Sequence, residues 1–184
     1  YASFNVNDLD TTRFATIYSF EEGQFKPEPQ AYNSRKQDID HYVMDSSTVI
    51  FSPTGGLKIS APDLARQALV QINDGTLDGR EVLTPESVAI MQTPISPGSQ
   101  DSVDEGLGYG FALQRTDKLI EGEIMTGHTG SAYGLFSAMF FEKDKKFGFV
   151  VLCNGCDTSI PRRENGFMPV QTDVINALYD IFIR

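Results

Sequence analysis

The chain has 184 residues, which is the length of about one domain. Its formal net charge of −10 argues against binding to nucleic acid or to acidic membranes, because both require clustered positive charge. Hydrophobic residues make up 40% of the chain and charged residues 22%, which is typical of a globular domain and excludes a disordered or collagen-like chain. The longest apolar run, residues 147–153, is far shorter than the roughly 20 residues of a membrane-spanning helix.

Residues 1–60 show little regular pattern. Residues 13–20 alternate enough to predict a short strand, followed by a turn at 21–23, whereas residues 25–47 have no consistent period. We therefore expect an irregular segment that contains one short strand. The chain starts at Tyr1 without a basic or apolar leader, so we expect a targeting signal to be absent or already removed.

Residues 61–94 are expected to be helical. Ser60 is a predicted N-cap, with Pro62 in the first turn and Asp63 at the third position. The helix places its apolar residues on one face: Leu64, Ala65, Ala68, Leu69 and Ile72. Thr84 begins a second, shorter helix that ends before Pro94.

From residue 106 to residue 155 the pattern becomes that of strands. We expect strands at 109–114, 122–126, 135–142 and 147–152, with a charged hairpin connection at 143–146. Residues 169–184 then repeat apolar side chains at helical spacing. The predicted fold class is α+β, an antiparallel sheet meander with the C-terminal helix packed on it.

The two cysteines, Cys153 and Cys156, have the C-x-x-C spacing of some redox proteins. A reactive pair normally opens a helix, whose N-terminus stabilises the thiolate. Here Asn154 and Gly155 close a strand. Two alternatives follow. The cysteines are either two small structural residues at a strand exit, with free thiols or a local disulfide, or they are a redox pair.

Residues 125–134, Met-Thr-Gly-His-Thr-Gly-Ser-Ala-Tyr-Gly, place small residues, hydroxyls and a histidine at the predicted exit of a strand. A ligand can approach the backbone closely there, and free N–H groups can stabilise an oxyanion. The alternative is a glycine-rich hairpin loop with a solvated His128. His41 is the other histidine of the chain, and no metal-ligand or phosphate-loop motif occurs, so we assign no metal and no cofactor.

An ordered series of segments stands out: residues 14–18, 53–65, 74–75, 83–87, 106–110, 128–130 and 150–155, of which the Gly55-Gly56-Leu57 run and His128-Thr129-Gly130 are the most specific in combination. Together they resemble the C-terminal half of the serine β-lactamase and penicillin-binding protein superfamily, in its class C-like branch. The branch includes D-alanyl-D-alanine carboxypeptidases, D-aminopeptidases and esterases. The resemblance implies a β-lactamase/transpeptidase-like fold and acyl-enzyme chemistry on an amide or ester bond.

The family takes its serine nucleophile from an S-x-x-K motif and a second group from a Y-x-N motif. No lysine of this chain has a serine three positions before it, and Tyr32-Asn33-Ser34 does not fit Y-x-N. The resemblance thus implies that the nucleophile-bearing N-terminal half is missing, and we expect the chain alone to be inactive. Family members usually act outside the cytoplasm, so we expect a periplasmic or extracellular protein.

The third family motif, often K-T-G, is His128-Thr129-Gly130 here. The resemblance implies that His128 lies near the nucleophile and the substrate carboxylate, that the Thr129 hydroxyl holds this carboxylate, and that Gly130 keeps the strand edge open. The Ser131 N–H would donate to the oxyanion. Because histidine titrates near neutrality whereas lysine stays charged, peptidase and esterase relatives are better guides than penicillinases.

Tyr109 and Tyr133 are further candidates for substrate binding. Tyr109 could line the cleft or pack on the sheet, and Tyr133 could shape its rim. The expected partner is a small-molecule or peptide substrate. The alternative function is a non-catalytic peptide-binding or cell-wall-binding module that uses the same strand edge.

Overall fold

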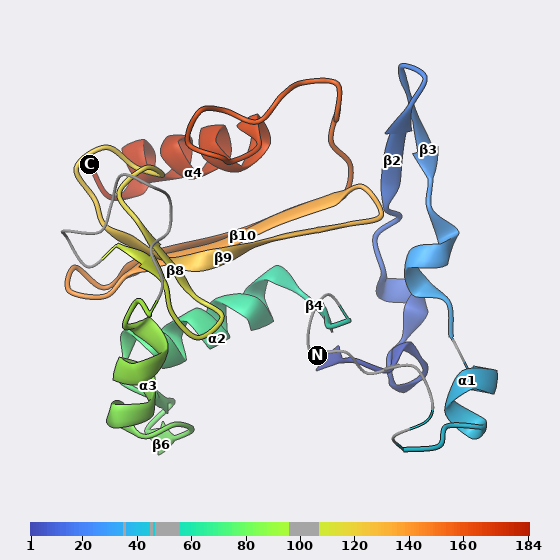
Figure 1. Ribbon diagram of the computed structural model, residues 1–184, viewed down its shortest axis with the longest axis horizontal. Helices are drawn as coiled ribbons and strands as arrows, with labels where there is room; N and C mark the ends of the chain where they lie inside the picture. Colours follow the sequence, from blue (N-terminus) through green and yellow to red (C-terminus); the bar gives the residue numbers. More distant parts are fainter. Residues whose placement is uncertain (35, 45, 47–55, 96–106) are drawn as a thin grey trace.

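The computed structural model describes residues 1–34, 36–44, 46, 56–95 and 107–184. A five-stranded antiparallel sheet with the strand order β11-β10-β9-β8-β7 forms its centre. The C-terminal helix α4 (Pro169–Phe182) covers one face of this sheet, and α2 (Ala61–Ile72) covers the other (Figure 1). The strands are β7 (Gly108–Tyr109), β8 (Gln114–Thr116), β9 (Met125–Ala132), β10 (Leu135–Glu142) and β11 (Phe147–Cys153). The predicted α+β class and the antiparallel sheet with a C-terminal helix are confirmed.

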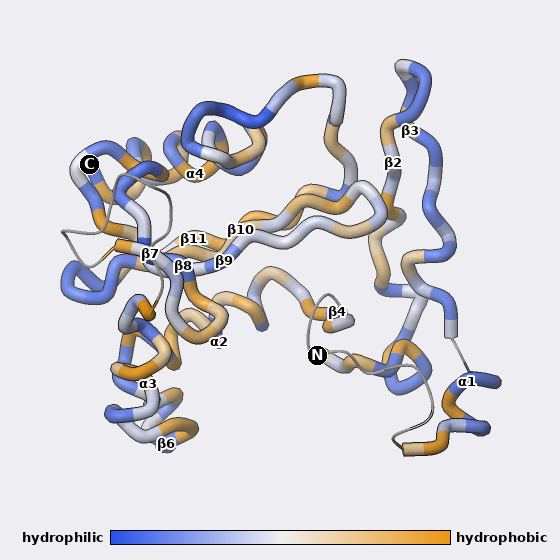
Figure 2. The backbone as a smooth tube through the Cα atoms, in the orientation of Figure 1, coloured by the Kyte–Doolittle hydropathy of each residue, from blue (hydrophilic) through white to orange (hydrophobic). Residues whose placement is uncertain are grey.

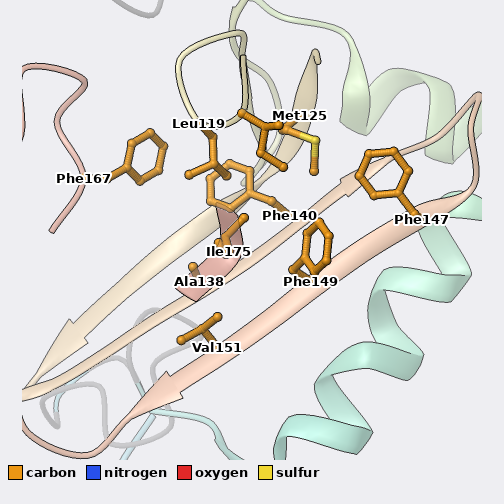
Figure 3. Close-up of a cluster of buried hydrophobic side chains, with 10 residues drawn as sticks. Leu119, Met125, Ala138, Phe140, Phe147, Phe149, Val151, Phe167 and Ile175 are labelled. Carbon is orange, nitrogen blue, oxygen red and sulfur yellow. The ribbon is translucent and has the colours of Figure 1, made fainter. Parts of the chain in front are cut away.

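The face of the sheet under α4 holds the larger core cluster (Figure 3). Alternate residues of β10 point into it. Phe140 of β10 and Ile175 of α4 are fully buried. Burial of each large apolar side chain contributes about 1.5–3 kcal/mol, so this cluster anchors the sheet to α4. The cluster consists of Leu119, Ile120, Met125, Ala138, Phe140, Phe147, Phe149, Val151, Phe167 and Ile175.

The opposite face of the sheet packs on α2. Ala68 and Ile72 of the helix contact Phe141. Phe141 follows Phe140 in β10, so its side chain points to the opposite face of the sheet. Because β10 is covered on both faces, its sequence is almost continuously apolar, as Figure 2 shows along its length. The start of α2 is as predicted, since the Ser60 hydroxyl accepts the Asp63 N–H.

A second helix, α3 (Pro85–Gln92), starts at Thr84 as predicted, and the Thr84 side chain caps it. Between the two helices lies a small hairpin that was not predicted, made of β5 (Thr76–Leu77) and β6 (Arg80–Glu81). Its turn places Asp78 and Gly79 at positive φ, 50° and 75°. An Asp-Gly pair is a strong signal for this hairpin turn, so the sequence did contain the information.

The N-terminal segment is more regular than expected. The strand predicted at 13–20 starts only at Tyr18, because Asp10 caps a short 3₁₀ turn, Thr11–Arg13, in place of extended chain. The stretch predicted to be irregular after residue 25 contains regular elements instead. They are β3 (Gln24–Pro27), a 3₁₀ helix (Pro29–Tyr32) and α1 (Lys36–Asp40). Nearer the N-terminus, β1 (Ala2–Ser3) pairs with β4 (Lys58–Ile59), and Val6–Asp8 forms another 3₁₀ turn.

The hairpin of β2 (Tyr18–Glu21) and β3 extends beyond the end of the central sheet (Figure 1). Its tip is acidic, and Lys26 forms ion pairs with Glu21 and Glu22. Phe20 and Phe25 pack edge to face across the two strands, with ring centroids 5.0 Å apart. This aromatic pair gives an otherwise exposed hairpin a small apolar centre.

Two of the predicted sheet strands are wrong in their limits. The strand predicted at 109–114 is divided into β7 and β8 by a turn in which Ala112 has φ 57°. The strand predicted at 122–126 is instead β9, which runs through residue 132, so the His128 motif lies within a strand and not beyond its exit. Of the segments that carry the family resemblance, residues 53–55 and 106 lie outside the described residues.

Candidate functional site

The His128 motif lies in the C-terminal half of β9, just before a two-residue hairpin turn. Ala132 pairs with Leu135, and the turn residues Tyr133 and Gly134 have φ of 53° and 86°. Positive φ at both positions defines the turn that matches the natural twist of a hairpin. Thus β10 fixes the register of the motif along its whole length.

The other edge of β9 is paired only in its first half. Among the described residues, β8 pairs with β9 at residues 125–127 and no further. The pair next to a two-residue turn exchanges hydrogen bonds and the pairs then alternate, so the Thr129 and Ser131 backbone groups point away from β10. The N–H groups of Thr129 and Ser131 therefore face the side of β9 that β8 does not reach.

The side chains of the motif alternate between the two faces of the sheet. His128 and Gly130 pair with Met139 and Ser137 of β10 and share with them the face that carries α2. Thr129, which pairs with Ala138, projects from the face that carries α4. The three motif residues are thus adjacent in one strand, but the His128 and Thr129 side chains can reach a common ligand only around the open strand edge.

His128 is solvent-exposed, and two neighbours position its ring. Its Nδ1 atom hydrogen-bonds to the Thr129 carbonyl oxygen. The ring of Tyr109 packs edge-on against it, with centroids 5.7 Å apart and an interplanar angle of 77°. Tyr109 is 37% exposed, so it both packs on the sheet and remains available to a ligand.

Tyr133 lies at the other end of the open edge. It is five positions after His128, which corresponds to about 16 Å along an extended strand. Its side chain is 56% exposed. Tyr109 and Tyr133 therefore lie at opposite ends of an elongated site, and we infer that a small ligand cannot contact both.

A cavity of about 420 Å³ adjoins the end of the motif strand. The sheet residues that line it include Ala132, Leu135 and Ser137, all from the face that carries His128 and Gly130. Its other walls come from the N-terminal segment and the start of α2, and among their residues are Phe14, Ile17, Tyr32, Leu57 and Leu64.

The cavity is mainly apolar with a few polar groups. Arg13 and Lys58 line it, as does Tyr32, whose hydroxyl donates to the Ala15 carbonyl oxygen at 2.9 Å. Burial raises the pKa of Tyr32 above its ordinary value. This wall was not predicted from the sequence, because the alternation at residues 13–20 indicates only a short strand and residues 25–32 follow no consistent period.

Within the described part of the chain, no group of three or more His, Cys, Asp or Glu side chains is arranged to hold a metal ion. Nor is any helix there long and apolar enough to cross a membrane.

Comparison with known proteins identifies the family and the fold. The model of the beta-lactamase family matches residues 2–167. A search of the curated proteins found no significant match. A structure of an octameric penicillin-binding protein homologue from Pyrococcus abyssi superposes with a TM-score of 0.63 at 22% identity, over 98% of this chain and 33% of that one.

A second solved structure, a candidate beta-lactamase from Bacteroides dorei, has a TM-score of 0.44 at 21% identity, over 72% of this chain and 43% of that one. The chain thus spans about a third of the length of the Pyrococcus protein, with which it shares a fold. Because the family model matches most of the chain, this protein belongs to the beta-lactamase family.

Proposed function

We propose that this chain forms one wall of the active site of a serine hydrolase that cleaves an amide or ester bond through an acyl-enzyme. The substrate is a β-lactam, a D-alanyl-D-alanine peptide or an ester. The single observation that carries the proposal is the open half of β9, where β8 pairing stops at Gly127. Among the described residues, no strand pairs with the backbone donors beside the His128 motif on that side.

Each motif residue then has a role. The Ser131 N–H donates to the oxyanion of the tetrahedral intermediate, a contribution typically worth about 100- to 1,000-fold in rate for one donor. The Thr129 hydroxyl and the His128 ring hold the substrate carboxylate. Gly130 carries no side chain, so a substrate backbone can lie close to the strand.

We further propose that the serine nucleophile and its S-x-x-K lysine come from residues outside this chain. No lysine in the chain has a serine three positions before it. The apolar cavity next to Ala132 lies on the same face of the sheet as His128 and Gly130. We assign this cavity to the serine-bearing segment of the same protein, which would bury the apolar walls and face the motif. We also propose that the protein acts outside the cytoplasm.

Two proteins test the proposal: this chain alone and a longer form of the same protein that includes an S-x-x-K motif. Each is mixed with a chromogenic β-lactam and with a nitrophenyl ester. We expect no turnover by this chain, and burst kinetics with an acyl adduct, seen by mass spectrometry, for the longer form. An acyl adduct on this chain alone would overturn the assignment of the nucleophile.

A non-catalytic binding module is the second candidate, because the same open edge can add an extended peptide as an extra strand. In that case a longer form would bind a D-alanyl-D-alanine peptide without forming an adduct. The Thr129→Val variant, which keeps the side-chain shape and removes the hydroxyl, is the matched probe. It weakens binding of a peptide with a free C-terminal carboxylate and leaves binding of the amidated peptide unchanged if Thr129 holds the carboxylate.

A further inference from the structure

Cys153 and Cys156 lie on the two sides of a bend at the end of the central sheet. Cys153 is the last residue of β11, the chain bends at Asn154, and Cys156 follows Gly155. Both thiols are half-buried and free. The Cys153 thiol donates to the Gly155 carbonyl oxygen, with an Sγ–O distance of 2.9 Å. The reduced bend is thus held by one of the two thiols.

The two residues between the cysteines attach the N-terminal segment to the sheet, and we call Asn154 and Gly155 the clasp. The Tyr18 N–H donates to the Asn154 carbonyl oxygen at 2.8 Å. The Asn154 side-chain amide donates to the Thr16 carbonyl oxygen at 2.7 Å. Gly155 also pairs with Tyr18 as a parallel bridge. The clasp therefore joins segments that are far apart in the sequence by two hydrogen bonds, and the one between Tyr18 and Asn154 is part of the parallel bridge.

The second position of the clasp is in close contact with the hairpin of β2 and β3. An added Cβ on Gly155 would lie 3.3 Å from the Tyr18 Cβ and 3.3 Å from the Phe25 ring. These distances leave little room for the bend to change while β2 and β3 stay in place. A change in the bend between the cysteines would therefore press on Tyr18 and Phe25 of the hairpin.

The segment held by the clasp borders the candidate site. Gly134, in the turn after the motif strand, packs so closely on Tyr18 that a Cβ there would overlap the Tyr18 carbonyl oxygen. Ile17 and Asn154 line the same cavity as Ala132 and Tyr133. The position of Tyr18 thus affects the wall of the cavity and the turn that ends β9.

We propose that Cys153 and Cys156 form a reversible disulfide that releases the clasp. Joining the two sulfur atoms removes the Cys153 thiol from the Gly155 carbonyl oxygen and tightens the bend. The Asn154 carbonyl turns with the bend and leaves the Tyr18 N–H. The result is a loosened β2–β3 hairpin beside the site in the oxidised protein.

The chemistry is thiol–disulfide exchange with a small-molecule disulfide such as oxidised glutathione. One protein thiolate attacks the disulfide, forming a mixed disulfide and releasing one glutathione thiolate. The second cysteine, after losing its proton to solvent, attacks the protein sulfur of that mixed disulfide and releases the second glutathione. Two protein thiols and one glutathione disulfide give one protein disulfide and two glutathione thiols.

The surroundings favour a slow, regulatory pair over a catalytic one. Burial raises the pKa of the Cys156 thiol, and the nearby Cys153 and Asp157 raise it further. The thiol therefore stays protonated at neutral pH, and exchange proceeds faster as the solution becomes more alkaline.

The test uses this chain, reduced and then equilibrated with excess oxidised glutathione. Mass spectrometry after alkylation reports free thiols, and hydrogen exchange reports the Tyr18 amide, with the Phe140 amide of the core sheet as an internal reference. We expect the mass of the oxidised chain to be lower by two hydrogens, with no glutathione retained. We expect the Tyr18 amide to exchange roughly tenfold faster or more than in the reduced chain, and the rate of the Phe140 amide to be unchanged. Dithiothreitol restores both readouts.

The single variants Cys153→Ser and Cys156→Ser are the matched controls. Each is expected to take up one glutathione, which dithiothreitol removes, and neither forms the internal bond. Glutathione retained on the unmodified chain would show that the cysteines cannot reach each other and would overturn the proposal. An oxidised chain whose Tyr18 amide exchanges at the reduced rate would also overturn it. None of these readouts depends on hydrolase activity.

Discussion

Gly130 and Ser137 face each other across β9 and β10, and a Cβ added to Gly130 would overlap the Ser137 hydroxyl oxygen. The hydroxyl is the end of a short side chain and can turn away. We predict that Gly130→Ala lowers the free energy of unfolding by about 1–2 kcal/mol. The double variant with Ser137→Ala is expected to recover most of this loss in urea unfolding.

Gly127 is the matched control in the same strand. A Cβ there would overlap the Met139 carbonyl oxygen, which belongs to the backbone of β10 and cannot turn. Gly127→Ala should therefore cost more than Gly130→Ala, about 3 kcal/mol or above, and Ser137→Ala should not rescue it. Equal losses for the two alanine variants would contradict the close packing described for Gly127.

Glu123 gives the protein a defined dependence on pH. Its side chain is 7% exposed, and it accepts from Lys145 Nζ at 2.6 Å and from the Tyr179 hydroxyl at 2.5 Å. The Lys145 hydrogen bond, followed by that of Tyr179, holds the pKa of Glu123 below its ordinary value. Because the folded pKa is the lower one, Glu123 contributes stability above the ordinary carboxyl pKa and loses it as the pH falls through the lowered pKa.

The Glu123→Gln variant tests this network. We expect a lower urea midpoint than that of the unmodified protein at pH 7, and a difference that shrinks once the pH falls below about 4, where an unfolded glutamate becomes protonated. Asp173→Asn, which removes the exposed ion pair with Arg163, is the control and should change the midpoint little at either pH. A Glu123→Gln deficit that persists unchanged in acid would show that packing, and not the charge, is responsible.

Tyr133 occupies a left-handed turn position that asparagine adopts more readily. We predict that Tyr133→Asn stabilises the fold by about 0.5–1 kcal/mol. If the exposed ring forms the rim of the site, the same change raises KM and leaves kcat nearly unchanged in a longer form that carries the nucleophile. Because the variant is expected to be the more stable protein, misfolding cannot explain weaker substrate binding. An unchanged KM would show that Tyr133 has a role in the turn and none in substrate binding.

Local signals in the sequence were sufficient for part of the fold. The N-cap at Ser60 and the helix start at Thr84 depend on side chains next to the helix start, and both were predicted. The limits of β9 were wrong because Gly127 and Gly130 suggest a loop, whereas both glycines are needed where β9 lies against β10. Pairing with β10 overrides the local preference, and such pairing is not visible in one strand alone.

The candidate site, too, combines features that local sequence signals predict with features that only the tertiary structure determines. The motif was recognised from residues 125–134, but its predicted place at the exit of a strand was wrong, because β9 continues through Ala132. The open strand edge beside Gly130 was an expectation that came from the family resemblance. The cavity could not be predicted, because its walls come from segments such as Phe14 and Leu64 that only the tertiary fold brings together. The separation of Tyr109 from Tyr133 likewise depends on the continuation of β9 to residue 132.

The acylation rate of the Ser131→Pro variant, in a longer form that carries the nucleophile, tests the central claim most directly. Proline removes the N–H of Ser131 but leaves the ladder with β10 intact, because this N–H points to the open edge. We predict a fall of about 100- to 1,000-fold for Ser131→Pro and little change for Ser131→Ala, which keeps the N–H. An acylation rate that Ser131→Pro leaves unchanged would contradict the assignment of this edge to the oxyanion.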